Sequence, residues 1–166
     1  MKDVSYALML IKANKLDGAR ELLEELLQSD PGNQDILYNL GMCYTELGEP
    51  ERAVETLSKC LRYYPHYANA HVALGFAYSR LDDDEKAMDH FERALEIEPS
   101  NPYALRNLGG LYGKKQDYGK AIPCLEKSFS INPDDQQTAY GLGYSYFHIG
   151  QIDEDDKYLK TAISLN

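Results

Sequence analysis

Apolar residues recur at helical spacing along this chain, in pairs of stripes that are separated by a short breaker. The clearest pair lies between residues 34 and 67, where the first stripe is Leu37, Leu40, Gly41 and Tyr44. The second stripe of this pair is Ala53, Val54, Leu57, Cys60 and Leu61. Residues three and four apart lie on one face of a helix, so each stripe predicts an amphipathic helix and the pair predicts a helical hairpin.

The hairpin pattern repeats with a fixed period of 34 residues. Four prolines mark this period, and they are Pro31, Pro65, Pro99 and Pro133. A glycine recurs in the first helices at the same spacing, at Gly41, Gly75, Gly109 and Gly143. Because glycine inside a helix costs about 1 kcal/mol relative to alanine, we expect the paired helices to approach closely at these positions. A period of this size indicates a helical-repeat architecture rather than a single globular fold.

The turns inside the hairpins follow the same period. Asn14, Gly48 and Gly150 occupy three of them, where a left-handed backbone is easiest for glycine and next for asparagine. Asp82 and Gln116 stand at the other two turns, and we expect those two turns to be held more tightly or to have a different shape.

The repeated motif resembles that of the tetratricopeptide-repeat family, whose unit is a helix-turn-helix of about 34 residues. Its residues in the second unit are Leu37, Leu40, Gly41, Tyr44, Ala53, Leu57 and Pro65, and the next two units repeat the pattern. The resemblance implies an all-α, right-handed α-solenoid of five hairpins that forms a single domain over residues 1–166. The expected repeats are approximately 1–33, 34–67, 68–101, 102–135 and 136–166.

Composition limits the classes of partner. Asp and Glu number 27 against 17 Lys and Arg, which gives a formal net charge of −10. A nucleic-acid partner is therefore not expected, since binding to a phosphate backbone needs a basic surface. No stretch approaches the roughly 20 apolar residues of a membrane span, so none is expected. Three scattered cysteines, Cys43, Cys60 and Cys124, argue against a disulfide framework and favour a reducing compartment, with the cytoplasm as the expected location.

The sequence shows no pattern of a catalytic or metal site. Cys60, His66 and His71 match no zinc spacing, and the first and last are expected to be core residues. The acidic runs at 82–85 and 153–156 lack the glycine and the distal glutamate of a calcium-binding loop. No phosphate-binding loop or nucleophile elbow is found. We therefore expect no cofactor, no metal and no enzymatic activity, and we predict a noncatalytic protein-interaction module.

One face of the first helices carries the candidate binding residues. In proteins of the resembled family this face lines a concave groove that binds an extended peptide or a partner helix. Mapped onto this sequence, the candidates are Tyr38, Asn39, Met42, Phe76, Arg80, Tyr103, Arg106, Asn107, Lys114, Tyr140 and Tyr144. Aromatic residues bury large areas at low entropic cost and are frequent at binding hot spots. We expect Arg80, Arg106 and Lys114 to have no acidic residue beside them on this face, which favours a protein or peptide partner with an acidic or C-terminal carboxylate group.

Two alternatives remain open at the C-terminal end. The last repeat has no distinct polar capping helix, so Tyr158, Ile163 and Leu165 are candidates for an edge that stacks on a second copy to form a homo-oligomer. The same edge fits a tetratricopeptide-repeat portion of a larger protein, in which further repeats or another domain follow.

Overall fold

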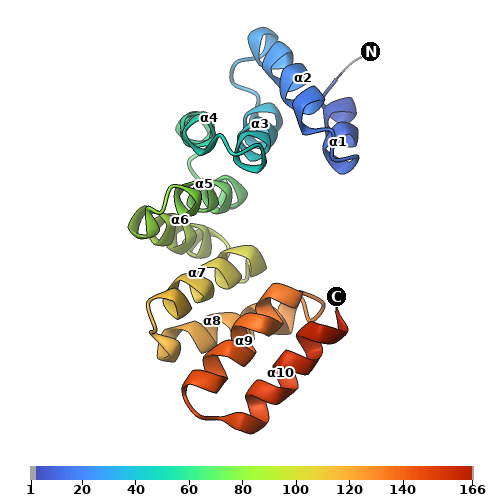
Figure 1. Ribbon diagram of the computed structural model, residues 1–166. Helices are drawn as coiled ribbons and strands as arrows, with labels where there is room; N and C mark the ends of the chain where they lie inside the picture. The colour runs from blue at the N-terminus through green and yellow to red at the C-terminus, as the bar shows by residue number, and fades with distance from the viewer. Residues whose placement is uncertain (1–2, 166) are drawn as a thin grey trace. The chain divides into compact units, whose positions relative to one another are not determined.

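The computed structural model describes residues 3–165 (Figure 1). Within this range ten α-helices follow one another and are joined by short turns. They are α1 (Val4–Lys12), α2 (Leu16–Ser29), α3 (Gln34–Glu46), α4 (Pro50–Tyr63), α5 (Ala68–Arg80), α6 (Asp84–Ile97), α7 (Pro102–Lys114), α8 (Tyr118–Ile131), α9 (Gln136–His148) and α10 (Ile152–Ser164). In the second to fifth hairpins, the first helix begins at intervals of 34 residues. The predicted all-α fold built from helical hairpins is confirmed.

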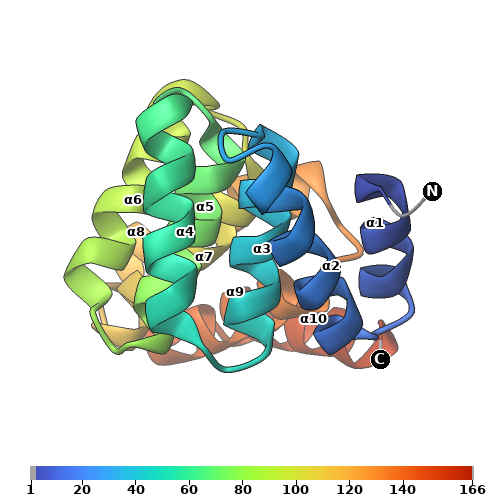
Figure 2. The ribbon, with the colours of Figure 1, turned by 90° about the horizontal axis from the view of Figure 1, so that it is seen from above.

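The chain divides into two compact units, Met1–His90 and Phe91–Asn166. In the first unit, α1 packs on α2, and α3 lies between α2 and α4 (Figure 2). In the second unit, α7 packs on α8, α8 on α9, and α9 on α10 (Figure 1). First helices of adjacent hairpins also touch, because α3 contacts α5 and α7 contacts α9. The expectation of one domain over residues 1–166 stays a prediction.

Residues from the predicted stripes form the core of each unit. Leu40 and Leu57 are at most 1% exposed in the first unit, and Leu142 is fully buried in the second. Cys60 and His71 are also buried, as expected of core residues. Burial raises the pKa of the Cys60 thiol to about 11, so this side chain is an uncharged core residue at neutral pH.

All five hairpin turns have the same conformation. The residues with positive φ are Asn14 (55°), Gly48 (77°), Asp82 (57°), Gln116 (61°) and Gly150 (79°). In each turn the following residue donates its N–H to the carbonyl oxygen five residues earlier, and the N···O distances lie between 2.8 and 3.0 Å. The expectation of a different shape at Asp82 and Gln116 is therefore wrong. The hydrogen bonds that end the first helix hold the backbone left-handed even where the residue is not glycine.

The paired helices approach closely at the repeated glycines of both units. A Cβ atom on Gly41 would lie 2.5 Å from Cγ of Leu57, and one on Gly109 would lie 2.7 Å from Cγ of Leu125. Gly143 has an equivalent leucine neighbour at 2.6 Å. The missing side chain on the first helix is thus replaced by a leucine from the second helix, which explains why glycine is tolerated there.

Candidate interaction surface

Exposed aromatic residues of the second unit gather along α9. Tyr140 and Tyr144 are four residues apart on one helix face, and their ring centroids are 6.4 Å apart. Tyr144 also contacts His148, and Tyr118 of α8 stacks on His148 with centroids 5.0 Å apart. Tyr140 is 59% exposed and Tyr144 is 43% exposed. The rings therefore form a row of apolar surface in contact with solvent, which is a feature of interaction sites.

Glycine residues next to this row leave room for a cavity of about 330 Å3. Gly110 and Gly113 of α7 line it, and a Cβ atom on either would meet no heavy atom within 4 Å. Tyr140 and Tyr144 line the same cavity from α9, together with Lys114 from the end of α7. A ligand side chain thus has space against bare helix backbone, with two rings and a cation around it.

Arg106 is an ion-paired residue rather than an open cation of this surface. Its Nη1 atom donates to Oδ2 of Asp135 at 3.1 Å, and its side chain is 24% exposed. The guanidinium carbon also lies 5.5 Å from the ring centroid of Tyr103. The expectation that no acidic residue lies beside Arg106 is therefore wrong. Asp135 is not among the residues that the repeat register places on the binding face, because it lies before α9 and serves as the N-cap of that helix.

Asp135 is held ionised by the groups around it. Burial by itself raises the pKa of this carboxyl group, but hydrogen bonds from Thr138 and Arg106 and the charge of Arg106 outweigh burial and lower the pKa below its ordinary value of 3.8. Asp135 also accepts a hydrogen bond from the backbone N–H of Gln137. The ion pair consequently joins α7 to the first turn of α9, and Arg106 positions these helices.

The two candidate asparagines are hydrogen-bonded to their own helices. Nδ2 of Asn39 donates to the carbonyl oxygen of Asp35 at 2.7 Å, and Nδ2 of Asn107 donates to that of Tyr103 at 2.8 Å. A ligand would have to compete with these backbone carbonyl groups for the amide donors.

The candidates of the first unit comprise a packed pair and a more open pair. Tyr38 packs on Tyr67 with ring centroids 5.4 Å apart, and Met42 is partly buried against the core. The guanidinium of Arg80, an exposed residue, lies 5.9 Å from the ring centroid of Phe76. Phe76 and Arg80 therefore offer an aromatic ring with a cation, whereas Tyr38 and Met42 mainly pack inside the unit.

The structure thus brings three of the predicted residues, Lys114, Tyr140 and Tyr144, around one cavity. Sequence reasoning missed Tyr118, which contacts Tyr144 with ring centroids 6.4 Å apart. This residue starts a second helix, outside the face that the repeat pattern selects. The equivalent positions of other repeats hold Pro50, Asp84 and Ile152. No residue type recurs there, so the 34-residue repeat does not mark Tyr118 as a surface aromatic residue.

No helix within residues 3–165 is long and apolar enough to cross a membrane. In the same range, His, Cys, Asp and Glu side chains form no group of three that could hold a metal ion.

The repeated helical hairpins define this chain as a helical-repeat protein. Comparison of the sequence with family models leads to the same class. Tetratricopeptide-repeat models match residues 10–59, 68–101, 104–135 and 137–166. The chain belongs to the tetratricopeptide-repeat family.

Solved structures of other proteins have the same fold as this chain. The crystal structure of MamA is 30% identical, with a TM-score of 0.79, and the match covers 96% of this chain and 93% of that chain. The crystal structure of PilW, a widely conserved type IV pilus biogenesis factor, is 24% identical, with a TM-score of 0.86, and the match covers 98% of this chain and 75% of that chain.

Among curated proteins, the human interferon-induced protein with tetratricopeptide repeats 2 is 35% identical over an alignment of 71 residues, and the match covers 39% of this chain and 15% of that protein. The chain therefore matches a small part of that relative. Repeats of this fold typically serve as noncatalytic interaction scaffolds, and this chain is a protein-interaction module in that general sense.

Proposed function

We propose that this chain is a noncatalytic adaptor or scaffold that binds an extended peptide segment of a partner protein on the face formed by α7 and α9. The cavity of about 330 Å3 supports this proposal, because exposed tyrosine rings and glycine residues of α7 line it together. Rigid rings supply contact area at low entropic cost, and the glycines let a ligand approach the helix backbone. Such a surface needs no cofactor.

The charge around the cavity favours a partner with a carboxylate group. Lys114 lines the cavity and is exposed. Asp135 is paired with Arg106, the other predicted cation of this unit, so the negative charge of Asp135 is already compensated. Phe76 and Arg80 form a second aromatic and cationic pair in the Met1–His90 unit, which would contact a partner in the same chemical manner.

Peptide selection tests this proposal. A phage-displayed library of random peptides is selected on the full chain, and the affinities of the enriched peptides are then measured by fluorescence anisotropy. Tyr140→Ala and Gly110→Met should each weaken binding by at least about tenfold, which is the size expected of a hot-spot contact worth about 1.4 kcal/mol. The methionine would fill the cavity without a clash in the fold, since nothing lies within 4 Å of its Cβ position.

Tyr63→Ala serves as the matched control for this selection. Tyr63 lies on α4 in the other unit and is 54% exposed, which is close to the exposure of Tyr140. Its removal should leave the affinity unchanged. Peptides that bind the wild type, Tyr140→Ala and Gly110→Met equally would exclude the α7–α9 face as the binding surface.

We also propose a reducing compartment, such as the cytoplasm, for this chain. The three cysteines are free thiols in the structure. Burial raises the pKa of Cys43 and Cys60 to about 11, so neither is a reactive thiolate at neutral pH. Core thiols without a disulfide partner are typical of proteins that are kept reduced.

A second candidate function is self-association through α10. Ile163 is 75% exposed and, with Leu159 and Tyr140, lines an apolar cavity of about 510 Å3. Of the residues predicted for this edge, Tyr158 does not belong to it, because it is 8% exposed and stacks on Tyr146 inside the unit. Ile163 would therefore be the main apolar contact with a second copy.

Sedimentation velocity over a range of protein concentrations tests self-association. The wild type should show a mass that rises with concentration, and Ile163→Asp should remain a monomer, because a buried unpaired carboxylate is costly. Ile131→Asp, at a residue that is 43% exposed at the end of α8, is the control and should behave as the wild type. A wild type that is monomeric throughout would refute this candidate.

A further inference from the structure

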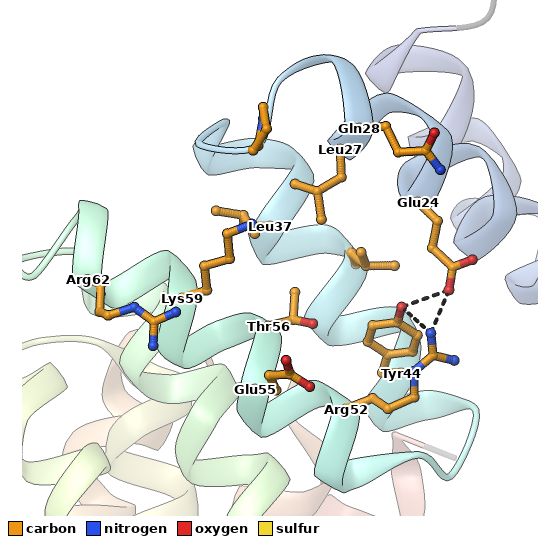
Figure 3. A pocket seen from close by; sticks show the side chains of 12 residues that line it. Glu24, Leu27, Gln28, Leu37, Tyr44, Arg52, Glu55, Thr56, Lys59 and Arg62 are labelled. Carbon is orange, nitrogen blue, oxygen red and sulfur yellow. Dashed lines mark hydrogen bonds and ion pairs between the residues drawn. The ribbon is translucent and has the colours of Figure 1, made fainter.

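A third cavity, of about 510 Å3, lies in the Met1–His90 unit. Residues of α2, α3 and α4 line it, and it opens between α2 and α4 (Figure 3). Its centre is apolar, since Leu27, Leu37 and Leu40 line it. The cavity does not involve any of the eleven residues predicted from the face of the first helices.

One end of this cavity is closed by a satisfied polar cluster. The hydroxyl of Tyr44 donates to Oε1 of Glu24 at 2.7 Å, and Nη2 of Arg52 donates to the same oxygen at 2.9 Å (Figure 3). The guanidinium carbon of Arg52 also lies 4.2 Å from the ring centroid of Tyr44. The carboxylate of Glu24 is thus neutralised within the protein.

The other end of the cavity carries two cations whose charges are not used by the protein. Lys59 and Arg62 stand one turn apart on α4, on the side of the cavity away from Tyr44 (Figure 3). Within residues 3–165 the structure shows neither an ion pair nor a hydrogen bond for either side chain. Lys127, two repeats later than Lys59, donates instead to the carbonyl oxygen of Pro99 at 2.6 Å. Glu55 also lines the cavity, from the α4 turn before Lys59, so the positive charge is confined to the end formed by Lys59 and Arg62.

The repeat itself shows what kind of group fills such a cavity. Thr56 of α4 lines it, and the residue three repeats later is Tyr158. The ring of Tyr158 stacks on Tyr146, with centroids 5.7 Å apart and planes within 3°. The same ring stands edge-on to Phe129 at 5.4 Å. Tyr146 and Phe129 are the counterparts of Tyr44 and Leu27, three repeats later. The ring of Tyr158 therefore fills, in the second unit, the space that is open beside Thr56 in the first unit.

We propose that the cavity between α2 and α4 binds a partner peptide in which an aromatic side chain stands next to carboxylate groups. The ring takes the place beside Thr56 that the chain's own Tyr158 ring takes in the second unit. The carboxylates pair with Lys59 and Arg62. The counterpart positions in the second unit are Thr161 and Ser164, so only the first of these two units combines the open cavity with the two cations.

Nuclear magnetic resonance titration of the 15N-labelled full chain tests this inference. The probe is a blocked pentapeptide with glycine at both ends and Glu-Phe-Glu in the centre, and the control probes carry Glu-Ala-Glu or Lys-Phe-Lys. The Glu-Phe-Glu probe should cause saturable shifts at Gln28, Thr56 and Lys59, and neither control probe should do so. Added salt should weaken the binding, because the ion pairs lie near the surface.

Substitutions separate the contribution of the ring from that of the charges. Thr56→Tyr should abolish the saturable shifts, because it fills the cavity as Tyr158 does, whereas Thr56→Ser should keep them. Replacing both Lys59 and Arg62 with alanine should weaken binding at least about tenfold, as expected for charge-assisted contacts. The double alanine variant of Lys12 and Lys115 has the same net charge and should bind as the wild type.

Several results would overturn the inference. The first is that the Glu-Phe-Glu probe causes no saturable shifts on α2 and α4. The second is that the Lys-Phe-Lys probe binds with the same affinity as the Glu-Phe-Glu probe. The third is that Thr56→Tyr binds the Glu-Phe-Glu probe with the affinity of the wild type. The inference is independent of the proposed α7–α9 surface, so Tyr140→Ala should leave these shifts unchanged. Shifts that disappear with Tyr140→Ala would move the site to that surface.

Discussion

Replacing Asp135 with alanine is expected to lower the free energy of unfolding by about 3 kcal/mol. The substitution removes the N-cap of α9 and with it the hydrogen bonds to Gln137 and Thr138. It also leaves the guanidinium of Arg106 without its carboxylate, in a site where Nε is already buried without a hydrogen-bond partner. Urea unfolding followed by circular dichroism measures the loss.

Asp117→Ala is the matched control for the ion pair. Asp117 is also an N-cap, of α8, but its partner Lys120 is 65% exposed and 3.5 Å away. Its loss should cost only about 1 kcal/mol, the usual contribution of a cap. Equal losses for the two variants would show that the pair of Arg106 and Asp135 adds nothing to stability.

The stabilisation by Asp135 should depend on pH in a definite direction. Because the folded protein holds the pKa of Asp135 below 3.8, the stabilisation is fully present above that value and is lost as the pH falls through the folded pKa. The stability difference between the wild type and Asp135→Ala should therefore shrink on acidification. A difference that grows at acid pH would contradict the assignment.

Replacing Gly109 with alanine is expected to destabilise the fold by about 2 kcal/mol, although alanine is the better helix former. The new Cβ atom would lie 2.7 Å from Cγ of Leu125 and 3.2 Å from the carbonyl oxygen of Ala121. Neither neighbour is the free end of a flexible side chain, so α7 and α8 would have to move apart. Thermal and urea unfolding both measure this change.

The adjacent glycine provides the control for Gly109→Ala. A Cβ atom on Gly110 meets no heavy atom within 4 Å, so Gly110→Ala should stabilise the helix by up to about 1 kcal/mol. Opposite signs for two neighbouring Gly→Ala substitutions would demonstrate that packing, rather than helix propensity, selects glycine at position 109. Stabilisation by both would refute the close approach of α7 and α8.

Much of the fold could be predicted from the sequence, because helix periodicity and turn residues are local signals. The spacing of Leu37, Leu40 and Tyr44 indicates a helix by itself. Residue preference alone gives the wrong shape for the turns at Asp82 and Gln116, because the hydrogen bonds that end the preceding helix fix the backbone there. Those bonds are the same in all five turns.

The candidate surface was predictable only in part. The repeat register selects Tyr140, Tyr144 and Lys114, because first-helix positions that face away from the hairpin contact recur every 34 residues, and the structure places these three around one cavity. The pairing of Arg106 could not be predicted, because its partner Asp135 is 29 residues away in the sequence. Distances between groups on different helices leave no local pattern.

By itself, the sequence determined that this chain is built of helical hairpins, because the 34-residue register of apolar residues, glycines and prolines specifies each helix and turn locally. Only the tertiary structure decided which surface groups are already paired and where side chains leave space. The place beside Tyr44 is open because Thr56 is short, and the equivalent place beside Tyr146 is filled by Tyr158. That difference depends on packing between neighbouring helices, which helical periodicity does not encode.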